Sequence, residues 1–432
     1  IGMVFQHFTL FESLTVAENI ALAIKGSVRS LRPQISEISQ RFGLPVDPDA
    51  LVHSLSMGER QRVEIIRCLL QEPRLVIMDE PTSVLPPSAV PLLFETIRKL
   101  AEAGCAILFI SHKLAEIKSL CHTATVMRGG KIVATVDPME KTSEELAKLM
   151  IGREIPHPKR PPAIPEKTDA IAIKNLTVVP SDPFGSVLQN IDLQVRPGEI
   201  VGIAGVSGNG QKELAAILSG ETVLPAANRK AITMFGEPVA DANCGQRRAL
   251  GLAFVPEDRN GRGAVPDMSL TNNAVLTAHR TGIARKGWID RKAALGFTEQ
   301  TIETSDVRCR GTQSEARSLS GGNLQKFILG REIGVKPKVL VAAQPTWGVD
   351  VGAATAIRQQ LVDLRSEGIA ILVISDDLEE LIDIADRFHV IFRGHLSPSI
   401  DRFDATEALI GRYMAGEFLE GRDPAMLSVG VA

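Results

Sequence analysis

The sequence predicts an α/β fold that occurs twice, as two domains in one chain of 432 residues. Short β-branched runs alternate with helical stretches, a pattern that is typical of a parallel or mixed sheet covered by helices. A set of short motifs is also repeated in fixed register, because the offsets 319 − 55, 344 − 80 and 376 − 112 are equal. An offset of this length indicates two whole domains rather than a solenoid of short repeats.

Composition limits the class of protein. With 44% hydrophobic and 23% charged residues, the chain is ordinary globular material and can bury two cores. Its net charge of −3 gives no electrostatic reason to expect nucleic acid or a membrane surface as a partner. The five cysteines form no CxxC pair, which argues for a reducing compartment and against disulfides or a zinc site. No apolar run reaches the ~18–20 residues that span a bilayer.

The domain boundaries follow from the repeat and from a proline-rich segment. We expect a first domain over residues 1–154, a linker over 155–169 and a second domain over 170–432. The linker is expected to be extended and semi-rigid because of its prolines. Glu257 in the second copy corresponds to Gln6 in the first. By this comparison, about 80 residues of the first domain, with its phosphate loop, are expected to precede the start of the chain.

Apolar runs place the individual elements. Short runs rich in β-branched residues are expected to form buried strands, and the stretches between them to form helices. The interval between Gln6 and the motif at Leu55 is expected to form a separate helical subdomain. Its counterpart in the second copy is longer (319 − 257 against 55 − 6), and we place the excess around Arg259–Asp267. The expected strands are 74–78, 106–110, 199–204 and 339–342, and the expected helices are 16–24, 88–103, 213–218 and 353–366.

A glycine-rich segment between a strand and a helix of the second domain has the pattern of a phosphate-binding loop. The N–H groups of such a loop can surround phosphate oxygens, and the helix N-terminus adds a favourable dipole. The usual lysine position holds Gln211, and the position of the hydroxyl that serves Mg²⁺ holds Lys212. We expect a loop that cradles phosphates with a displaced cation; a plain glycine-rich turn is the alternative. The candidate binding residues are Gly205, Ser207, Gly208, Asn209, Gly210, Gln211 and Lys212.

Two acidic residues end a hydrophobic strand of the first domain. Asp79 is expected to organise Mg²⁺, and Glu80 to orient or activate the attacking water. Their counterparts are Ala343 and Gln344, which supply no carboxylate. Because loss of a general base costs roughly 10²–10⁴ in rate, the second copy is expected to lack hydrolysis. Two solvated acids at a strand edge are the alternative.

A histidine after the next strand completes the candidate catalytic set. His112 could hydrogen-bond a γ-phosphate and the attacking water, and its counterpart is Asp376. The spacing from Glu80 to His112 recurs between Gln344 and Asp376, which favours a functional role over that of an ordinary surface histidine. One copy is therefore expected to hydrolyse a nucleotide and the other to hold one.

Leu55–Glu59 and Leu319–Asn323, each followed by a glutamine and a basic residue, resemble the signature loop of ABC-transporter ATPases. In that family of P-loop NTPases two nucleotide-binding domains sit head to tail with ATP between them. The resemblance implies ATP and Mg²⁺ as cofactors, and domains that pair within the chain or with a second copy. It implies a competent site in which Gln6, Asp79, Glu80 and His112 are closed by Ser320, Gly321 and Gly322, with Gln6 and Asp79 at the metal. It implies a degenerate site in which residues 205–212 are closed by Ser56 and Gly58.

Val255–Arg259, Ala343–Thr346 and Val349–Ala353 more specifically resemble the fused tandem ATPases of bacterial importers for simple sugars and nucleosides. Residues 6–8 and 14–19 resemble the nucleoside subgroup. The resemblance implies an ATPase subunit that energises a membrane importer, with nucleosides as the expected cargo. It implies transmembrane permease subunits and an extracytoplasmic substrate-binding protein as partners, no nucleic acid, and a peripheral position at the cytoplasmic face of the membrane.

Three alternatives stay open. A simple-sugar importer ATPase would share the mechanism and differ in cargo. A soluble tandem ATPase acting on ribosomes or DNA usually keeps both sites intact and has a long charged linker, unlike this chain. An inactive fragment is the third, and without the first phosphate loop we expect little or no ATP hydrolysis by the chain as printed.

The aromatic residues give little further information. Phe184 is a weak candidate for stacking on adenine, and Trp288 and Trp347 are expected to be packing residues. The charged segment Glu257–Arg259 is expected either to face the permease or to be a solvated charge cluster.

Overall fold

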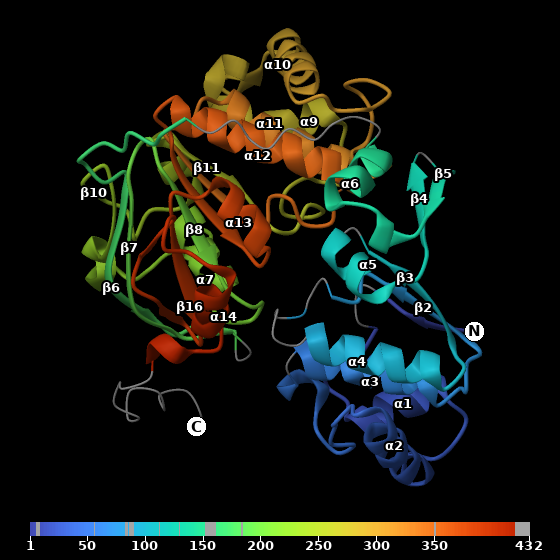
Figure 1. Cartoon of the computed structure of the whole chain (residues 1–432). Helices are drawn as coiled ribbons and strands as arrows, with labels where there is room; N and C mark the ends of the chain where they lie inside the picture. Colours follow the sequence, from blue (N-terminus) through green and yellow to red (C-terminus); the bar gives the residue numbers. More distant parts are fainter. Residues whose placement is uncertain are drawn as a thin grey trace. The chain divides into compact units, whose positions relative to one another are not determined.

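The computed structural model describes the chain except residues 6–8, 56, 83–84, 86–89, 112, 129, 152–160, 183–184, 350 and 420–432. The chain divides into two compact units, Ile1–Ile155 and Pro156–Ala432, which are described separately (Figure 1). Within the described ranges, no helix has the length and apolar character needed to cross a membrane.

The first unit contains a three-stranded parallel sheet in the order β1-β2-β3. Alternate residues of its strands, such as Val76 and Met78, pack against apolar side chains of α3 and α4. Among the described residues β3 pairs with β2 alone, and its Leu108 and Ile110 are exposed. The strands are β1 (Gly2–Val4), β2 (Leu75–Asp79), β3 (Ala106–Ile110) and the separate hairpin β4 (Ala124–Arg128) and β5 (Lys131–Val136). The helices are α1 (Val16–Ala23), α2 (Val28–Phe42), α3 (Met57–Leu69), α4 (Val90–Glu102), α5 (Leu114–Leu120) and α6 (Ser143–Ile151).

The helical subdomain begins in the same way in both units, with a capped helix and a buried asparagine. Thr15 and Glu18 form a capping box at α1, which satisfies N–H groups that the first turn cannot bond internally. Asn19 accepts from the Phe11 N–H (2.7 Å) and donates to the Phe11 carbonyl (3.0 Å), so it ties the preceding loop to the helix. Asn273 makes the same pair of bonds with Val265 at α9, at 2.8 and 3.0 Å.

The second unit is built around a mixed sheet of seven strands in the order β11-β14-β15-β8-β16-β17, with β18 also on β16. The first five strands run parallel. Because successive side chains of a strand point to opposite faces, Val373 lies in the core under α11 and α12, while Leu372 and Ile374 lie in the core shared with α7 and a second, antiparallel sheet. Figure 1 shows α11 and α12 on one face of the main sheet and β6, β7 and β10 on the other.

The strands of this unit comprise the main sheet and two smaller pairings. The main sheet has β8 (Ile200–Ala204), β11 (Leu252–Val255), β14 (Val339–Ala343), β15 (Ala370–Ser375), β16 (Arg387–Phe392), β17 (His395–Leu396) and β18 (Ile400–Asp401). The antiparallel sheet has β6 (Ile171–Val178), β7 (Leu188–Val195), β9 (Ile232–Met234) and β10 (Glu237–Pro238), and a hairpin joins β12 (Ala284–Arg285) and β13 (Trp288–Ile289).

The helices of the second unit include some that pack on each face of the main sheet. They are α7 (Gln211–Ser219), α8 (Cys244–Ala249), α9 (Leu270–Ala278), α10 (Arg291–Thr304), α11 (Gly321–Gly334), α12 (Val351–Ser366), α13 (Leu378–Ile384) and α14 (Glu407–Met414). The chain that enters this unit is fastened to it: the Arg365 guanidinium donates to the Pro161 carbonyl, and the Glu166 N–H donates to the Pro197 carbonyl at 3.0 Å.

The α/β class is confirmed, and the predicted strands coincide with β2, β3, β8 and β14 to within one residue at each end. Three predictions were wrong. The strand at 106–110 was expected to be buried, but the residues of β3 are exposed or half-buried. The excess length of the second copy does not lie mainly around Arg259–Asp267: residues 279–290, with the β12/β13 hairpin, separate α9 from α10, whereas residues 24–27 suffice between α1 and α2. Trp288 is not a packing residue, because this hairpin leaves it 82% exposed.

Candidate functional site

The candidate site of the second unit lies along one edge of the main sheet. Strand register places Val255 beside Ala342, Ala343 beside Ile374, and Ser375 beside Ala204. The segments that begin with Pro256, Gln344, Asp376 and Gly205 therefore leave neighbouring parallel strands at their carboxyl ends. This edge is where open α/β sheets bind ligands.

The predicted phosphate loop connects β8 to α7 and is held from several sides. Gly208 and Gly210 have φ of +89° and +113°, values that residues with a Cβ rarely adopt. Asn209 accepts from the Arg393 N–H at 2.8 Å, and its carbonyl accepts from the Gly394 N–H at 2.9 Å. The Ser186 hydroxyl donates to the Gly208 carbonyl at 2.6 Å. The loop is thus braced by the segments that precede β7 and follow β16.

Gln211 folds back into this loop. Its Nε2 donates to the Val206 carbonyl at 2.8 Å, and its Oε1 accepts from the Asn209 N–H at 3.0 Å. The Gln211 side chain is buried, and a Cβ at Gly205 would come within 2.8 Å of its Nε2. One of the N–H groups predicted to face phosphate is therefore bonded to the side chain that replaces the usual lysine. Ser207 lies in the same loop, and Lys212 is exposed in the first turn of α7.

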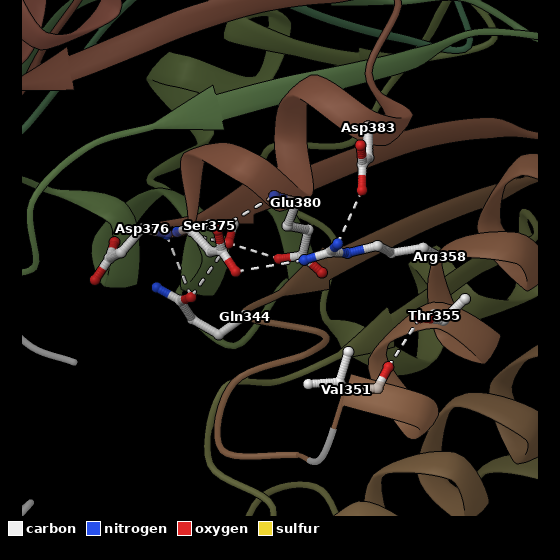
Figure 2. A network of polar contacts seen from close by, with 9 residues as sticks. Gln344, Val351, Thr355, Arg358, Ser375, Asp376, Glu380 and Asp383 are labelled. Atoms are coloured by element: carbon white, nitrogen blue, oxygen red, sulfur yellow. Dashed lines mark hydrogen bonds and ion pairs between the residues drawn. The ribbon is translucent and has the colours of Figure 1, made fainter. Parts of the chain in front are cut away.

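The ends of β14 and β15 are joined by polar contacts (Figure 2). The Gln344 Oε1 accepts from the Asp376 N–H at 3.3 Å and lies 3.5 Å from the Ser375 Oγ. Ser375 donates to Glu380 at 2.6 Å and accepts from the Asp377 N–H at 3.1 Å. The side chain of Gln344 therefore holds the turn after β15.

An arginine on α12 holds the same turn from the opposite side. Arg358 forms ion pairs with Asp383 at 2.9 Å and with Asp377 at 3.5 Å. Figure 2 shows it between the turn after β15 and α13. Because charge-assisted bonds fix side chains more firmly than neutral ones, this pair of contacts orients the segment that carries Asp376.

Two carboxyls with raised pKa values lie at this edge. Burial, and then the nearby charge of Glu257, raise the pKa of Asp376 to about 7. The Asp376 Oδ1 is shut off from solvent and has no hydrogen-bond partner among the described residues. Burial also raises the pKa of Glu257, while the ammonium of Lys212 opposes the rise at both carboxyls. Both carboxyls are thus near enough to Lys212, in the first turn of α7, to interact with its charge.

The first unit has the same backbone framework with different side chains. The Glu80 N–H donates to the Ile110 carbonyl at 2.9 Å, as the Gln344 N–H does to Ile374 at 2.7 Å. Both residues have positive φ, +45° and +51°, an uncommon conformation that is often kept at functional sites. Asp79 lies at the end of β2 and is partly exposed. Gln6 and His112, predicted to belong to this site, lie outside the described residues, as does Phe184.

The turn after β3 contains a serine that makes the same two contacts as Ser375 in the turn after β15. Ser111 donates to Glu116 at 3.0 Å and accepts from the Lys113 N–H at 3.0 Å. The glutamate was not among the predicted site residues, although Glu116 and Glu380 have the same offset (380 − 116) as the other repeated motifs. The repeat alone could have identified it.

The predicted signature segments begin helices in both units. Ser320 is the N-cap residue of α11, and its hydroxyl accepts from the Asn323 Nδ2 at 2.8 Å. Gly321 and Gly322 form the first turn of this helix. In the first unit Gly58 lies in α3, while Ser56 lies outside the described residues.

Arg259 is a second residue whose role the sequence did not give. Its guanidinium lies 5.8 Å from the Trp347 ring centre and donates to the Gly348 carbonyl at 3.3 Å. A Cβ on Gly321 would lie 2.5 Å from the Arg259 Nη1. Arg259 therefore packs inward between the signature helix and the loop after Gln344, so the expectation of a solvated cluster is wrong for this residue.

The two units differ in their fit to Mg²⁺, which prefers carboxylate and other oxygen ligands. The first unit offers the Asp79 carboxylate at the carboxyl end of a parallel strand. At the matching place the second unit has the methyl group of Ala343, and the loop hydroxyl is replaced by Lys212. At this position the first unit therefore offers a ligand of the kind that the ion prefers, and the second unit does not.

Comparison with known proteins places this geometry in a family. The model of the ABC transporter family matches residues 1–83 and 188–347. The chain is 37% identical to the nucleoside import ATP-binding protein NupA of Lactococcus lactis, over 96% of the chain and 83% of NupA. It is also 37% identical to the guanosine import ATP-binding protein NupO of Bacillus subtilis (96% and 82% covered) and to the glucose import ATP-binding protein TsgD13 of Haloferax volcanii (96% and 82%).

Solved structures agree on the fold. The archaeal ribosome recycling factor aABCE1, in complex with a ribosomal stalk protein, matches with a TM-score of 0.62 at 18% identity, over 93% of this chain and 73% of that one. The RNase-L inhibitor matches with a TM-score of 0.60 at 19% identity, over 98% and 79%. These identities support a shared fold alone, so they give no weight to a ribosomal role. From the repeated motifs, the matched strand edges and these relatives, the chain belongs to the ABC transporter family, as a tandem ATP-binding protein of the kind that couples ATP hydrolysis to transport.

Proposed function

We propose that this protein hydrolyses ATP at its first site and uses the energy for import through a membrane permease. The observation that carries the proposal is the pair Glu80 and Gln344, which share an unusual backbone conformation and the same backbone bond but differ in chemistry. A carboxylate can orient and deprotonate water, whereas an amide cannot act as a base.

The proposed first site contains Glu80 as the residue that positions the attacking water, with His112 beside the terminal phosphate. Asp79 and Gln6 would hold Mg²⁺, which neutralises phosphate charge when it is bound. Family resemblance supports closure of this site by Ser320, Gly321 and Gly322 of the second copy. Their place at the N-terminus of α11 supports the same role, because N–H groups there favour an anion.

The proposed second site binds nucleotide through residues 205–212 and is closed by Ser56 and Gly58 of the first copy. Gly205–Gly210 supply a loop with backbone N–H groups, while Ala343 and Gln344 supply no carboxylate. We propose that this site holds a nucleotide through many turnovers. Binding at the first site would draw the copies together, and loss of phosphate would remove charge-assisted contacts and release them.

Nucleosides are the proposed cargo, supported by the relatives NupA and NupO. Simple sugars are the second candidate, supported by TsgD13 and by ribose import ATP-binding proteins at 32–35% identity. The proposed partners are transmembrane permease subunits and, through them, an extracytoplasmic binding protein. The proposed location is peripheral, on the cytoplasmic face of the membrane.

Reconstitution tests both the proposed ATP-driven import and the proposed cargo. The protein as its own cell produces it is placed in proteoliposomes with its permease and binding protein, and uptake of labelled guanosine, uridine, ribose and glucose is measured with and without ATP. ATP-dependent uptake of a nucleoside supports the proposal, and uptake of a sugar alone supports the second candidate. Absence of ATP-dependent uptake for the whole panel, with an intact complex, would refute both.

A further inference from the structure

A hairpin of the second unit lies on its helical subdomain and has no counterpart in the first unit. Residues 279–290, with β12 and β13, separate α9 from α10, whereas residues 24–27 connect the equivalent helices α1 and α2. Figure 1 shows α10 on the side of α11 that faces away from the main sheet. Among the described strands, β12 and β13 pair only with each other. The hairpin is therefore an addition to the helical subdomain and takes no part in the main sheet.

The base of this hairpin is anchored in the unit. The Asp290 N–H donates to the Ile283 carbonyl at 2.7 Å. Ile283 is buried in a small core with Ala278 of α9 and Ala294 of α10. Because an isolated two-stranded hairpin is marginally stable in water, this anchored base is what holds the two short strands in place.

The turn of the hairpin presents two apolar side chains to solvent. Lys286 and Gly287 connect the strands with φ of +49° and +83°, as the tight type I′ turn requires. Trp288 follows directly and is 82% exposed, and Ile289 is 55% exposed. Since burial of such side chains is favourable, a well-formed hairpin that leaves both in water indicates contact with another surface.

Positive charge lies on both sides of this apolar pair along the chain. Although the whole chain has a net charge of −3, residues 279–292 contain five Arg or Lys and one Asp. Lys286, Arg291 and Lys292 are exposed, and no ion pair joins them to an acidic residue within the described part of the chain. The single acidic residue, Asp290, is engaged as the N-cap of α10, where its carboxylate accepts from two N–H groups at 3.0 Å.

Two of these basic residues stand where a helix favours the opposite charge. Arg291 and Lys292 occupy the first turn of α10, which has no acidic residue. The helix dipole places positive charge at this end, so cations here are unfavourable for the helix itself. The stability of α10 therefore does not explain their position, whereas an anionic surface beside the hairpin would offset the cost.

We propose that the hairpin β12/β13 contacts the membrane, with Trp288 and Ile289 in the headgroup region of anionic phospholipids. Lys286, Arg291 and Lys292 bind the phosphate groups of those lipids. The inference rests on the proposed function, because it takes a peripheral position at the membrane as given. Tryptophan beside lysine and arginine is the combination that anchors proteins at the headgroup level. Interfaces between proteins are depleted in lysine, so a permease surface is the less suitable partner.

The test uses the whole protein, without permease or ATP, and reads the fluorescence of Trp288. Trp347→Phe leaves Trp288 as the only tryptophan. Vesicles of phosphatidylcholine are compared with vesicles in which about a third of the lipid is phosphatidylglycerol. We expect binding to the anionic vesicles to be about tenfold stronger or more and to weaken with added salt. The Trp288 emission should shift to the blue on binding, because its ring leaves water.

Two variants separate the apolar contribution from the charges. Trp288→Ala should weaken binding to the anionic vesicles by about tenfold. Each basic residue near an anionic surface contributes about fivefold to binding. The variant that combines Lys286→Gln, Arg291→Gln and Lys292→Gln should therefore weaken binding by about 100-fold.

Matched controls change residues of the same kind elsewhere in the second unit. Phe403→Ala removes an aromatic side chain that is 93% exposed but lies between Asp401 and Asp404 in the sequence. A combined control removes three exposed positive charges outside the hairpin, and both controls should bind like the unaltered protein. Its changes are Lys174→Gln, Lys230→Gln and Arg402→Gln.

Equal binding to both kinds of vesicle, an unchanged Trp288 emission on bound vesicles, or equal binding by the two combined variants would each overturn the inference. An emission shift seen only on phosphatidylcholine vesicles that contain the permease would assign the hairpin to a protein surface and would also overturn it. ATP-driven uptake in proteoliposomes would still stand in those cases. Loss of uptake with anionic-lipid binding intact would instead refute the proposed function alone.

Discussion

Restoring the missing glutamate by itself should not restore hydrolysis to the second site. In Gln344→Glu the backbone is already suitable, because Gln344 shares the positive φ and the strand-to-strand bond of Glu80. The new carboxylate could also accept from the Asp376 N–H, which lies 3.3 Å from the present Oε1. Neither geometry nor hydrogen bonding therefore opposes the change.

The surrounding charges do oppose it. Above about pH 7, where Asp376 is ionised, a carboxylate at this position would be beside a second charge, and two charges ~5 Å apart at an effective dielectric constant of about 20 repel by roughly 3 kcal/mol. Ala343 supplies no metal ligand, and the position of the imidazole holds the Asp376 carboxyl. A well-placed base is worth roughly 10²–10⁴ in rate, whereas here we expect a gain below about threefold.

The assay isolates the second site by placing Gln344→Glu in a Glu80→Gln background. ATP turnover is measured with the protein as its cell produces it, reconstituted with its permease. A combined variant that also carries Ala343→Asp and Asp376→His tests the explanation, because it restores the ligand and the imidazole. A rise of tenfold or more from Gln344→Glu alone would refute the reasoning.

Three further predictions concern the framework of the second unit. Ser375→Ala removes the 2.6 Å bond to the fully buried Glu380, so the free energy of unfolding in urea should fall by about 2 kcal/mol. In the folded protein the pKa of Asp376 is raised from the ordinary value of 3.8 to about 7. Between these pH values the unfolded chain loses this proton while the folded chain keeps it. Rising pH should therefore lower the stability of the unaltered protein relative to Asp376→Asn by about 2–4 kcal/mol. Arg259→Lys loses the contact with the Trp347 ring and should cost about 1 kcal/mol in the same urea experiment.

Matched substitutions serve as controls for these measurements. The control for Ser375→Ala is Ser366→Ala, which removes a hydroxyl that bonds a carbonyl of its own helix. The controls for Asp376→Asn and Arg259→Lys are Asp404→Asn and Arg310→Lys, which change exposed residues. Equal losses for Ser375→Ala and Ser366→Ala would contradict the importance of the buried carboxyl. Parallel stability curves from pH 4 to 8 for Asp376→Asn and the unaltered protein would contradict the raised pKa, and an unchanged midpoint for Arg259→Lys would contradict its packing role.

Much of the fold was predictable because its signals are local or periodic. Buried parallel strands are continuous apolar runs, so β14 could be placed directly from the sequence. The apolar run of β3 also gave its position, although its residues are not buried. The repeat then identified which residues occupy equivalent places, including the change from Glu80 to Gln344. Parallel strands end at one edge, which brings Gln344 and Asp376 together without further information.

The remainder depended on side-chain geometry that no pattern encodes. Gln211 was expected to bind phosphate as part of the loop, but its side chain bonds Val206 and Asn209 of the loop itself. Trp288 was expected to pack because large aromatic residues usually do, yet the hairpin that carries it leaves its ring in solvent. Arg259 was a charged residue among charged residues, and only its contact with Trp347 shows that it faces inward.

The asymmetry of the two copies is tested most directly by removing the one glutamate that is proposed to act. In the reconstituted transporter, Glu80→Gln should lower ATP turnover and coupled uptake by about 100-fold or more, while Gln344→Ala should change turnover by less than about threefold. If Glu80→Gln retained turnover within threefold of the unaltered protein, hydrolysis would not depend on the first copy and the account would fail.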